Sequence, residues 1–162
     1  MMKSLPIPIN IDLMIYDCDG VLTDNKVIVD EHGHEYVSFH RGDGLAISRI
    51  KNELMIRQVV ISTEKNPVVL RRCEKLGIPV INAVEDKSIA VRDYCMKNQI
   101  ALDKVMFIGN DLNDAGAMNE VGFTGCPADA EPEIKCISGW ISEKNGGYGV
   151  IRDLYRVLSS QR

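Results

Sequence analysis

The chain has 162 residues, a length at which a single domain can bury most of its apolar surface, so we expect one domain over residues 1–162. Its 45% hydrophobic and 26% charged residues exclude a disordered chain, and no apolar run approaches the roughly 20 residues that cross a bilayer. The net charge of −4 offers no basic surface for nucleic acid, so we expect neither nucleic acid nor a membrane as a partner.

The first ten residues and the cysteines indicate the cellular compartment. Residues 1–10, MMKSLPIPIN, lack an uninterrupted apolar core, so they predict a flexible leader rather than a secretory signal. The five cysteines are odd in number and show no C-x-x-C spacing, which argues against a disulfide framework and a zinc site. These features favour the cytoplasm.

Short apolar runs alternate with helical patterns along the chain. The runs are residues 11–16, 54–61, 78–81, 105–108 and, more weakly, 121–125. Helical patterns lie between or after them, at residues 66–77, 86–99 and 113–122. Near-continuous apolar strands are expected where helices cover both faces of a sheet. The alternation therefore predicts an α/β fold with a doubly wound parallel sheet and right-handed connections.

One segment interrupts the alternation. Residues 25–39, NKVIVDEHGHEYVSF, have β-branched and aromatic residues on either side of DEHG, which predicts a β-hairpin. Because it follows the first strand directly, we expect it to project as a flap from the carboxyl edge of the sheet. That edge is where open α/β sheets bind ligands.

Polar residues follow the predicted strands at this same edge. They are Asp17 and Asp19 after the first strand, Ser62 and Thr63 after the second, Lys87 just inside the helix after the third, and Asn110 and Asp111 after the fourth. Parallel strands end at one edge, so we expect these side chains to converge on one crevice. Together they supply the groups that phosphoryl transfer needs, namely a nucleophile, an acid/base, a phosphate clamp and metal ligands.

The crowding of Asp17 and Asp19 predicts a magnesium site. In an extended segment residues two apart point the same way, so both carboxylates face one site while Cys18 faces the sheet interior. Carboxylates this close repel each other unless a hard divalent cation such as Mg²⁺ lies between them. A structural role also fits these residues: Asp17 would cap a turn, and Asp24 and Asn25 would lead into the hairpin.

Four motifs in this order resemble the haloacid dehalogenase superfamily of phosphatases. DCDGVLTD at residues 17–24 is similar to the first motif, Ser62 to the second, Lys87 to the third and GNDLND at residues 109–114 to the fourth. The resemblance spans about residues 11–158. The short chain, the hairpin in place of a cap domain, FHRGDGLAI and EKNGGYGVIRDL resemble the cap-less branch that acts on sugar-acid phosphates. This implies a Rossmann-like fold with a hairpin flap and no cap domain.

The resemblance also implies residue roles. Asp17 would be the nucleophile that becomes an aspartyl phosphate, and Asp19 would act as the acid and then the base. Ser62 would donate to the phosphoryl oxygens, and Lys87 would balance their charge. Mg²⁺ would be held by the Asp17 carboxylate, the Asp19 backbone carbonyl and the fourth motif.

The fourth motif departs from the usual Gly-Asp-Asp of the family. Asn110 stands where an acid usually ligates the metal, which removes one negative charge from the site. We expect Asn110 to be the direct ligand, with Asp111 close by, and Asp114 to orient Lys87 or a coordinated water from behind. Asp111 and Asp114 also suit the start of the following helix, and both roles can coexist.

Candidate substrate contacts come from two further segments. Related octulosonate 8-phosphate phosphatases tend to have Gly-Arg where this chain has Thr63 and Glu64, which favours a sialic-acid-type 9-phosphate, with 3-deoxy-octulosonate 8-phosphate next. Arg41 and Asp43, in a loop expected past the hairpin, are candidates for contacts with the phosphosugar. Lys75 could meet a sugar carboxylate, although its helix also fits a plain solvated face.

The resemblance implies a homotetramer built on the hairpins, in which residues 145–149 reach a neighbouring active site. The main hypothesis is therefore a Mg²⁺-dependent phosphatase of nonulosonate biosynthesis. A catalytically weak tetramerisation module associated with sialic-acid activation is the alternative, and the change at Asn110 keeps it open. A phosphoryl-accepting receiver domain ranks last, because no aspartate directly follows the third apolar run.

Overall fold

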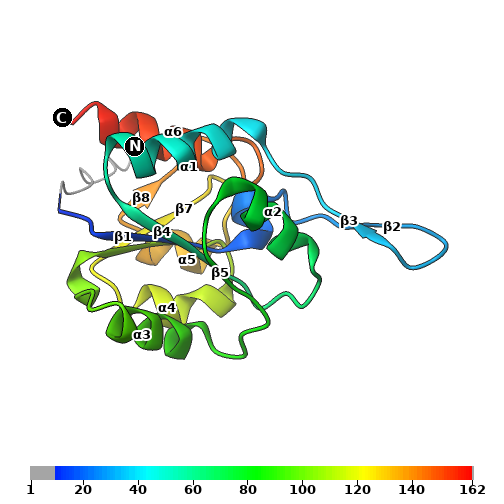
Figure 1. Ribbon diagram of the computed structural model, residues 1–162, viewed down its shortest axis with the longest axis horizontal. Helices are drawn as coiled ribbons and strands as arrows, with labels where there is room; N and C mark the ends of the chain where they lie inside the picture. Colours follow the sequence, from blue (N-terminus) through cyan, green and yellow to red (C-terminus); the bar gives the residue numbers. More distant parts are fainter. Residues whose placement is uncertain (1–9, 162) are drawn as a thin grey trace.

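Six parallel strands form the centre of the molecule, and helices cover both faces of the sheet (Figure 1). The computed structural model describes residues 10–161. The strands are β1 (Leu13–Tyr16), β4 (Arg57–Ile61), β5 (Val80–Ile81), β6 (Val105–Ile108), β7 (Phe123–Cys126) and β8 (Trp140–Ile141). Their order is β5-β4-β1-β6-β7-β8, so β1 lies inside the sheet between β4 and β6.

The predicted fold class is confirmed. Each of the five apolar runs overlaps a strand, and β8, which is two residues long, is the one described strand of the sheet that the sequence missed. The expected leader at residues 1–10 lies outside the described residues except for Asn10. Within residues 10–161, no helix is long and apolar enough to cross a membrane.

The helices form two layers. One layer holds α1 (Arg41–Glu53), α2 (Val68–Leu76) and α6 (Val150–Ser159), and the other holds α3 (Lys87–Lys97), α4 (Ala115–Met118) and α5 (Pro132–Ile137) (Figure 1). Side chains of β1 alternate between them: Met14 and Tyr16 pack in the core of the first layer, whereas Leu13 and Ile15 pack in that of the second. Burial on both faces explains why the strands are apolar throughout.

Three short turns complete the chain between these elements. They are η1 (Cys18–Leu22), η2 (Leu102–Lys104) and η3 (Leu112–Asp114). The first follows β1 and the third follows β6, so both lie at the carboxyl edge of the sheet.

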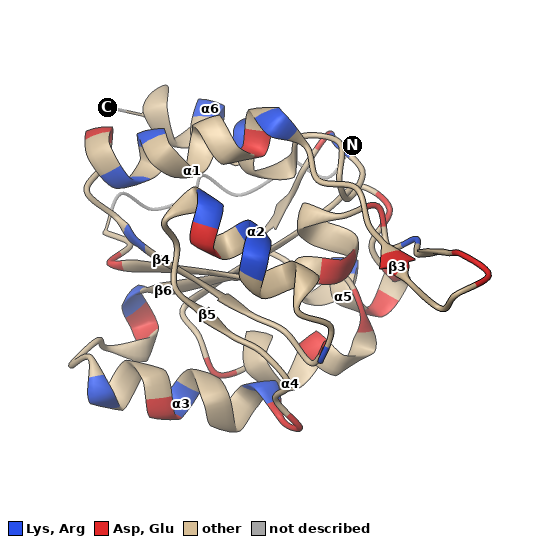
Figure 2. Ribbon diagram, turned by 45° about the vertical axis from the view of Figure 1, so that its right-hand side comes forward, with Lys and Arg blue, Asp and Glu red and all other residues tan. Residues whose placement is uncertain are grey.

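The predicted hairpin is present and projects away from the sheet (Figures 1 and 2). Its strands β2 (Ile28–Val29) and β3 (Glu35–Tyr36) are antiparallel, with Ile28 opposite Tyr36. The Asp30 carboxylate holds the tip by accepting hydrogen bonds from the backbone N–H groups of His32 and His34, each at 2.9 Å. At the other end, Asn66 Nδ2 donates to Glu35 Oε2 at 2.8 Å, which links the hairpin to the start of α2.

Candidate active site

The first catalytic motif leaves β1 in the middle of the sheet. The Asp17 N–H donates to the Ile108 carbonyl at 2.9 Å, which continues the β1–β6 pairing past the end of the strand. The Cys18 side chain is buried, as the alternation of an extended segment requires. Gly20 has a φ of +90°, and a Cβ there would lie 2.0 Å from the end of the Asn110 carboxamide. Glycine is therefore needed where the chain turns past Asn110.

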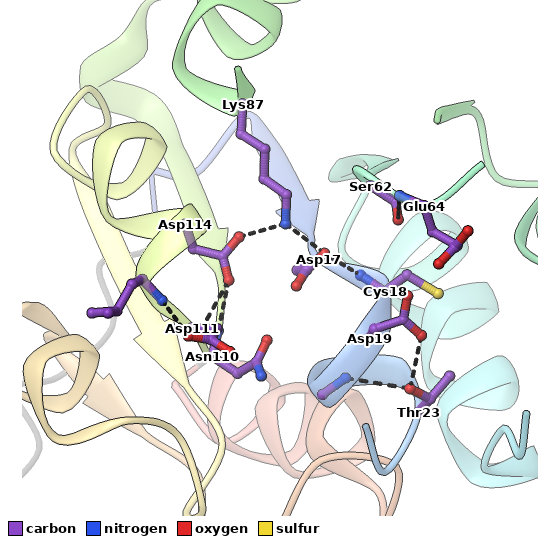
Figure 3. A network of polar contacts seen from close by, with 12 residues as sticks. Asp17, Cys18, Asp19, Thr23, Ser62, Glu64, Lys87, Asn110, Asp111 and Asp114 are labelled. Atoms are coloured by element: carbon purple, nitrogen blue, oxygen red, sulfur yellow. Dashed lines mark hydrogen bonds and ion pairs between the residues drawn. The ribbon is translucent and has the colours of Figure 1, made fainter. Parts of the chain in front are cut away.

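A buried lysine joins two buried carboxylates beside this turn (Figure 3). Lys87 Nζ lies 2.7 Å from Asp17 Oδ1 and 2.6 Å from Asp114 Oδ1. Lys87 is the first residue of α3, and Asp86 caps that helix by accepting from the Ser88 N–H at 2.8 Å. Of the two partners expected for Asp114, Lys87 or a coordinated water, the structure shows the contact with Lys87.

Asp114 also fixes the loop that carries the fourth motif. Its Oδ2 accepts from the backbone N–H of Asn110 at 2.8 Å and from that of Asp111 at 3.3 Å. The Asp111 carboxylate accepts from the Leu112 N–H at 2.6 Å and so caps η3. The structure thus engages the Asp111 side chain at the helix start rather than beside Asp17.

The pKa values of both Asp17 and Asp19 are raised, which suits Asp19 as an acid and means that a cation would help to keep Asp17 ionised. Burial raises the pKa of Asp17 to about 7, and the nearby Asp114 charge adds to this, against the lowering effect of Lys87. Burial also raises the pKa of Asp19, although a hydrogen bond from Thr23 Oγ1 at 3.2 Å opposes it. Burial alone would lower the pKa of Lys87, but Asp17 and Asp114 raise it by more than burial lowers it. The pKa is therefore above its ordinary value, and the ammonium stays charged.

Three groups fit a Mg²⁺ ion. One terminal atom of the Asn110 carboxamide lies 3.1 Å from Asp17 Oδ2 and 2.8 Å from the Asp19 carbonyl oxygen. With the amide nitrogen there, it donates to both oxygens; with the amide oxygen there, three acceptors face one another with no proton between them, as ligands around a hard cation do. Among the described residues no group of three His, Cys, Asp or Glu side chains could hold a metal, so this site depends on the amide and the backbone carbonyl.

A cleft of about 240 Å³ opens beside Asp19, between the turn at residues 18–24 (hereafter the catalytic turn), the hairpin and the start of α2. Its described lining carries the carboxylates of Asp19, Glu35 and Glu64 and the ammonium of Lys26. Glu64 Oε1 is held by the backbone N–H groups of Lys65 and Asn66 at 2.6 and 2.8 Å. A larger hollow of about 790 Å³ along β5 and α3 contains none of the motif residues, so chemistry and not size identifies the site.

The other predicted substrate residues do not line this cleft. Arg41 and Asp43 lie in the first turn of α1, so the prediction of a loop at these residues is wrong. Asp43 is buried and accepts from the Arg152 N–H at 2.9 Å. Thr63 is exposed just past β4, and Lys75 is exposed in the last turn of α2. Ser62 is buried at the end of β4, at the same edge as Asp17, and its Oγ accepts from the Glu64 N–H at 3.1 Å.

The sequence missed three residues that shape the site. Thr23 supports the Asp19 carboxyl, and Glu35 and Asn66 join two walls of the cleft. Thr23 lies within the first motif, four residues after Asp19. A prediction that the chain forms a closed turn there would have suggested the hydrogen bond between Thr23 and Asp19. No sequence signal links Glu35 to Asn66, because their contact depends on the orientation of the hairpin relative to the start of α2.

Comparison with known proteins decides the family. Residues 64–154 match the haloacid dehalogenase-like hydrolases. The chain belongs to this family. This family assignment excludes a receiver domain. The protein is an enzyme of the haloacid dehalogenase-like hydrolase family.

Individual relatives agree with this assignment. The chain is 33% identical over 150 residues to the 3-deoxy-D-manno-octulosonate 8-phosphate phosphatase of Escherichia coli K12, covering 92% of this chain and 79% of the relative. A crystal structure from Streptomyces avermitilis, assigned to the same hydrolase family, has a TM-score of 0.89 at 36% identity and covers 92% and 85% of the two chains. The octulosonate 8-phosphate phosphatase of Moraxella catarrhalis, in complex with magnesium, phosphate and the sugar, has a TM-score of 0.89 at 30% identity and covers 94% and 88%.

These relatives carry two conclusions for the haloacid dehalogenase-like enzyme. It is a phosphatase of the cap-less branch, and its relative from Moraxella catarrhalis binds magnesium as a cofactor. The convergence of Asp17, the Asp19 carbonyl and Asn110 is the feature of this chain that fits the cofactor.

Proposed function

We propose that this phosphatase hydrolyses the phosphate ester of a sugar acid, with sialic-acid-type 9-phosphates preferred and 3-deoxy-octulosonate 8-phosphate next. We further propose that the whole chain acts as one phosphatase domain. The observation that carries the reaction is the pair of carboxylates, Asp17 and Asp114, bridged by Lys87 at the carboxyl edge of the sheet. The names of the relatives support a sugar-acid phosphate as the substrate.

In the proposed reaction Asp17 attacks phosphorus and forms an aspartyl phosphate. The bond from phosphorus to the sugar oxygen breaks, its electron pair stays on that oxygen, and Asp19 supplies the proton. Water then attacks the phosphorus and gives its proton to the Asp19 carboxylate, while the bond to Asp17 breaks and phosphate leaves. The raised pKa of Asp19 favours both halves of this cycle, because the group must hold a proton and later take one.

The remaining motif residues would stabilise charge. Ser62 Oγ would donate to a phosphoryl oxygen, and Lys87 would offset the charge that Asp17 and the phosphoryl group bring together. Asp17, the Asp19 carbonyl and Asn110 would hold Mg²⁺, which when bound neutralises the phosphate and keeps Asp17 ionised. We propose that Asp111 acts through the helix start rather than as a ligand, since its carboxylate caps η3.

The cleft supports the preference for a 9-phosphate. A 9-phosphate has one more backbone carbon than an 8-phosphate between its phosphate and its carboxylate, and both chains carry several hydroxyl groups. The carboxylates of Glu35 and Glu64 would accept hydrogen bonds from such hydroxyls but would repel a sugar carboxylate bound beside them. A longer polyol segment places the substrate carboxylate farther from this wall. Arg41, Thr63 and Lys75 remain candidates for that more distant contact.

A panel of sugar-acid phosphates tests the substrate. We expect a higher kcat/KM on 9-phosphates than on octulosonate 8-phosphate, and we expect Glu64→Arg combined with Thr63→Gly to reverse that order. Glu133→Arg, the same charge change on exposed α5, is the control and should leave the order unchanged. Equal rates on both substrates, or an octulosonate preference of the unaltered enzyme, would contradict the proposed preference.

We also propose a homotetramer assembled through the hairpins in the cytoplasm. Val27, Ile28, Val29 and Tyr36 are each more than half exposed on a two-stranded hairpin, which is marginal in water by itself. Packing against other copies would bury these side chains. Sedimentation of the purified protein should give a tetramer, and Ile28→Glu should shift it toward smaller species; an unaltered protein that sediments as a monomer would contradict the assembly.

A second candidate is a tetramerisation module with weak catalysis, which the amide at Asn110 and the exposed apolar hairpin favour. Phosphate release from an aryl phosphate separates the two. An enzyme should release phosphate only with Mg²⁺, whereas a module should assemble and remain inert.

A further inference from the structure

Asp43 caps a helix that has no cap of its own. The residue before α6 is Gly149, which has no side chain to accept a hydrogen bond from the first turn. Asp43, in the first turn of α1, supplies the missing acceptor: its Oδ1 lies 2.9 Å from the Arg152 backbone nitrogen. Asp43 is only 3% exposed, and its other oxygen has no hydrogen-bond partner among the described residues. A buried carboxylate that faces the backbone N–H groups of Ile151 and Arg152 in the first turn of a helix is held there by the positive end of that helix.

The start of α6 holds the glycine-rich segment 145–149 against the catalytic turn. The Gly147 N–H donates to the Val21 carbonyl at 3.0 Å. A Cβ on Gly146 would lie 2.0 Å from the Gly20 carbonyl oxygen, and one on Gly147, whose φ is +73°, would lie 2.5 Å from the Asp24 nitrogen. The two backbones therefore touch directly, so a shift of the glycine segment moves the turn behind Asp19.

That turn orients the carboxyl group of Asp19. The Thr23 N–H donates to the Cys18 carbonyl at 3.1 Å and closes the turn. Thr23 Oγ1 then donates to Asp19 Oδ1 at 3.2 Å and accepts from the Gly20 N–H at 3.3 Å. Because Gly146 also faces the Thr23 carbonyl, the threonine is supported from the glycine segment.

We propose that Asp43 is a positioning residue for the acid/base step: by capping α6 it fixes the glycine segment, and through Thr23 it sets the direction of the Asp19 carboxyl. The proposal rests on the proposed function, since it needs Asp19 to protonate the leaving group. It replaces a substrate contact for Asp43, which is buried away from the cleft.

Aryl phosphates with leaving groups of different basicity test the proposal. A poor leaving group such as phenol depends on the proton from Asp19, whereas 4-nitrophenol leaves with little help. We expect Asp43→Ala to reduce kcat/KM, which reports the step that forms the aspartyl phosphate, about tenfold more on phenyl phosphate than on 4-nitrophenyl phosphate. Asp43→Asn keeps an oxygen that can accept from the Arg152 N–H and should restore the normal ratio. Leu158→Ala weakens the far end of the same helix and should lower both rates equally or not at all.

Equal losses on the two substrates in Asp43→Ala would overturn the proposal, because a variant that only lowers the folded fraction cannot change their ratio. If Asp43→Ala does not fold, Asp43→Ser, whose hydroxyl is too short to reach the same amide, takes its place.

Hydrogen exchange of residues 18–24 gives a readout without turnover. Asp43→Ala should raise exchange there and Leu158→Ala should not, and unchanged exchange in Asp43→Ala would also overturn the proposal. Unaltered enzyme that hydrolyses no phosphate ester would overturn the proposed function instead, while the exchange measurement would still decide the role of Asp43.

Discussion

The carboxyl edge of the sheet and the hairpin differ in how firmly they are held. Every residue of β1 and β6 is buried, and at the edge where these strands end Lys87 and Asp114 are each bonded to two or more partners. The hairpin has strands of two residues and presents apolar side chains to solvent. The comparison indicates that the motif residues are held firmly at the carboxyl edge, which we call the braced edge, whereas few contacts hold the hairpin, on which the proposed substrate preference and assembly depend.

The largest effect should come from breaking the braced edge at its centre. Asp17→Asn removes the nucleophile while keeping the size of the side chain, so kcat should fall by about 10³-fold or more. The matched change on the hairpin, Asp30→Asn, should leave kcat within about threefold of the unaltered enzyme, since the exposed tip touches no motif residue. Phosphate release measures both, and comparable losses would remove the distinction between the two regions.

Gly146→Ala should break the support behind the catalytic turn. The new Cβ would meet the Gly20 carbonyl at 2.0 Å, so the backbone must shift, and we expect the free energy of unfolding to fall by about 2–3 kcal/mol. Gly116→Ala adds the same methyl group in α4 with ordinary packing against Ser88, and should be neutral or stabilising by up to about 1 kcal/mol. Urea unfolding of the two variants compares them, and a Gly146→Ala midpoint equal to that of Gly116→Ala would contradict the close contact.

Asn110→Asp should sharpen the dependence of the edge on metal. Without Mg²⁺ the change removes two donated hydrogen bonds and adds a third nearby negative charge, so the melting temperature should fall. With Mg²⁺ the added carboxylate should strengthen binding on the order of tenfold. Asn113→Asp places the same charge on an exposed neighbour as the control. Calorimetric titration and thermal unfolding give the result, and unchanged Mg²⁺ affinity would argue against Asn110 as a ligand.

The raised pKa of Asp17 predicts a pH dependence confined to the edge. Its pKa is about 7 in the folded protein against 3.8 for a free side chain, so the folded state binds the proton more tightly. Metal-free protein should therefore lose stability as pH rises from about 4 to about 7. Mg²⁺ competes with that proton, so the rise in melting temperature on adding Mg²⁺ should grow between about pH 5.5 and pH 8. A shift that is constant over this range would place the metal away from Asp17.

The smallest effect should come from the hairpin. Ile28→Glu changes an exposed side chain with one cross-strand partner, so the unfolding free energy of the dissociated protein should change by no more than about 0.5 kcal/mol. Chemical unfolding at low protein concentration measures this. A loss of several kcal/mol would mean that the hairpin supports the fold as well as the surface.

Much of the edge was predictable because parallel strands bring their ends together. Apolar runs marked five of the six strands, and the polar residues after them led to Asp17, Asp19, Ser62 and Asn110 at the strand ends and to Lys87 at the start of the next helix. These positions depend only on strand order and on the direction of side chains in extended chain. Strand β8 was missed because two residues, Trp140 and Ile141, make too short a pattern.

The remaining errors concern contacts between elements that are distant in the chain. Asp43 was expected to bind substrate, yet it caps α6 because Gly149 leaves that helix without a side-chain acceptor. A loop was expected at Arg41 and Asp43, which instead lie in the first turn of α1; that turn also contains Gly42 and Gly44, which have low helix propensity. Local patterns cannot say which distant helix end needs a partner, and that need decides the role of Asp43.

Strand β1 pairs with β4 on one side and β6 on the other, and both partners come later in the sequence. The first motif therefore leaves the ribosome before these neighbouring strands are synthesised. Asp17 bonds to Lys87, Lys87 bonds to Asp114, and the turn after Asp17 bonds to Gly147. All three partners are synthesised later than the first motif. A nascent chain that has not yet passed Gly147 should therefore be inert toward phosphate esters.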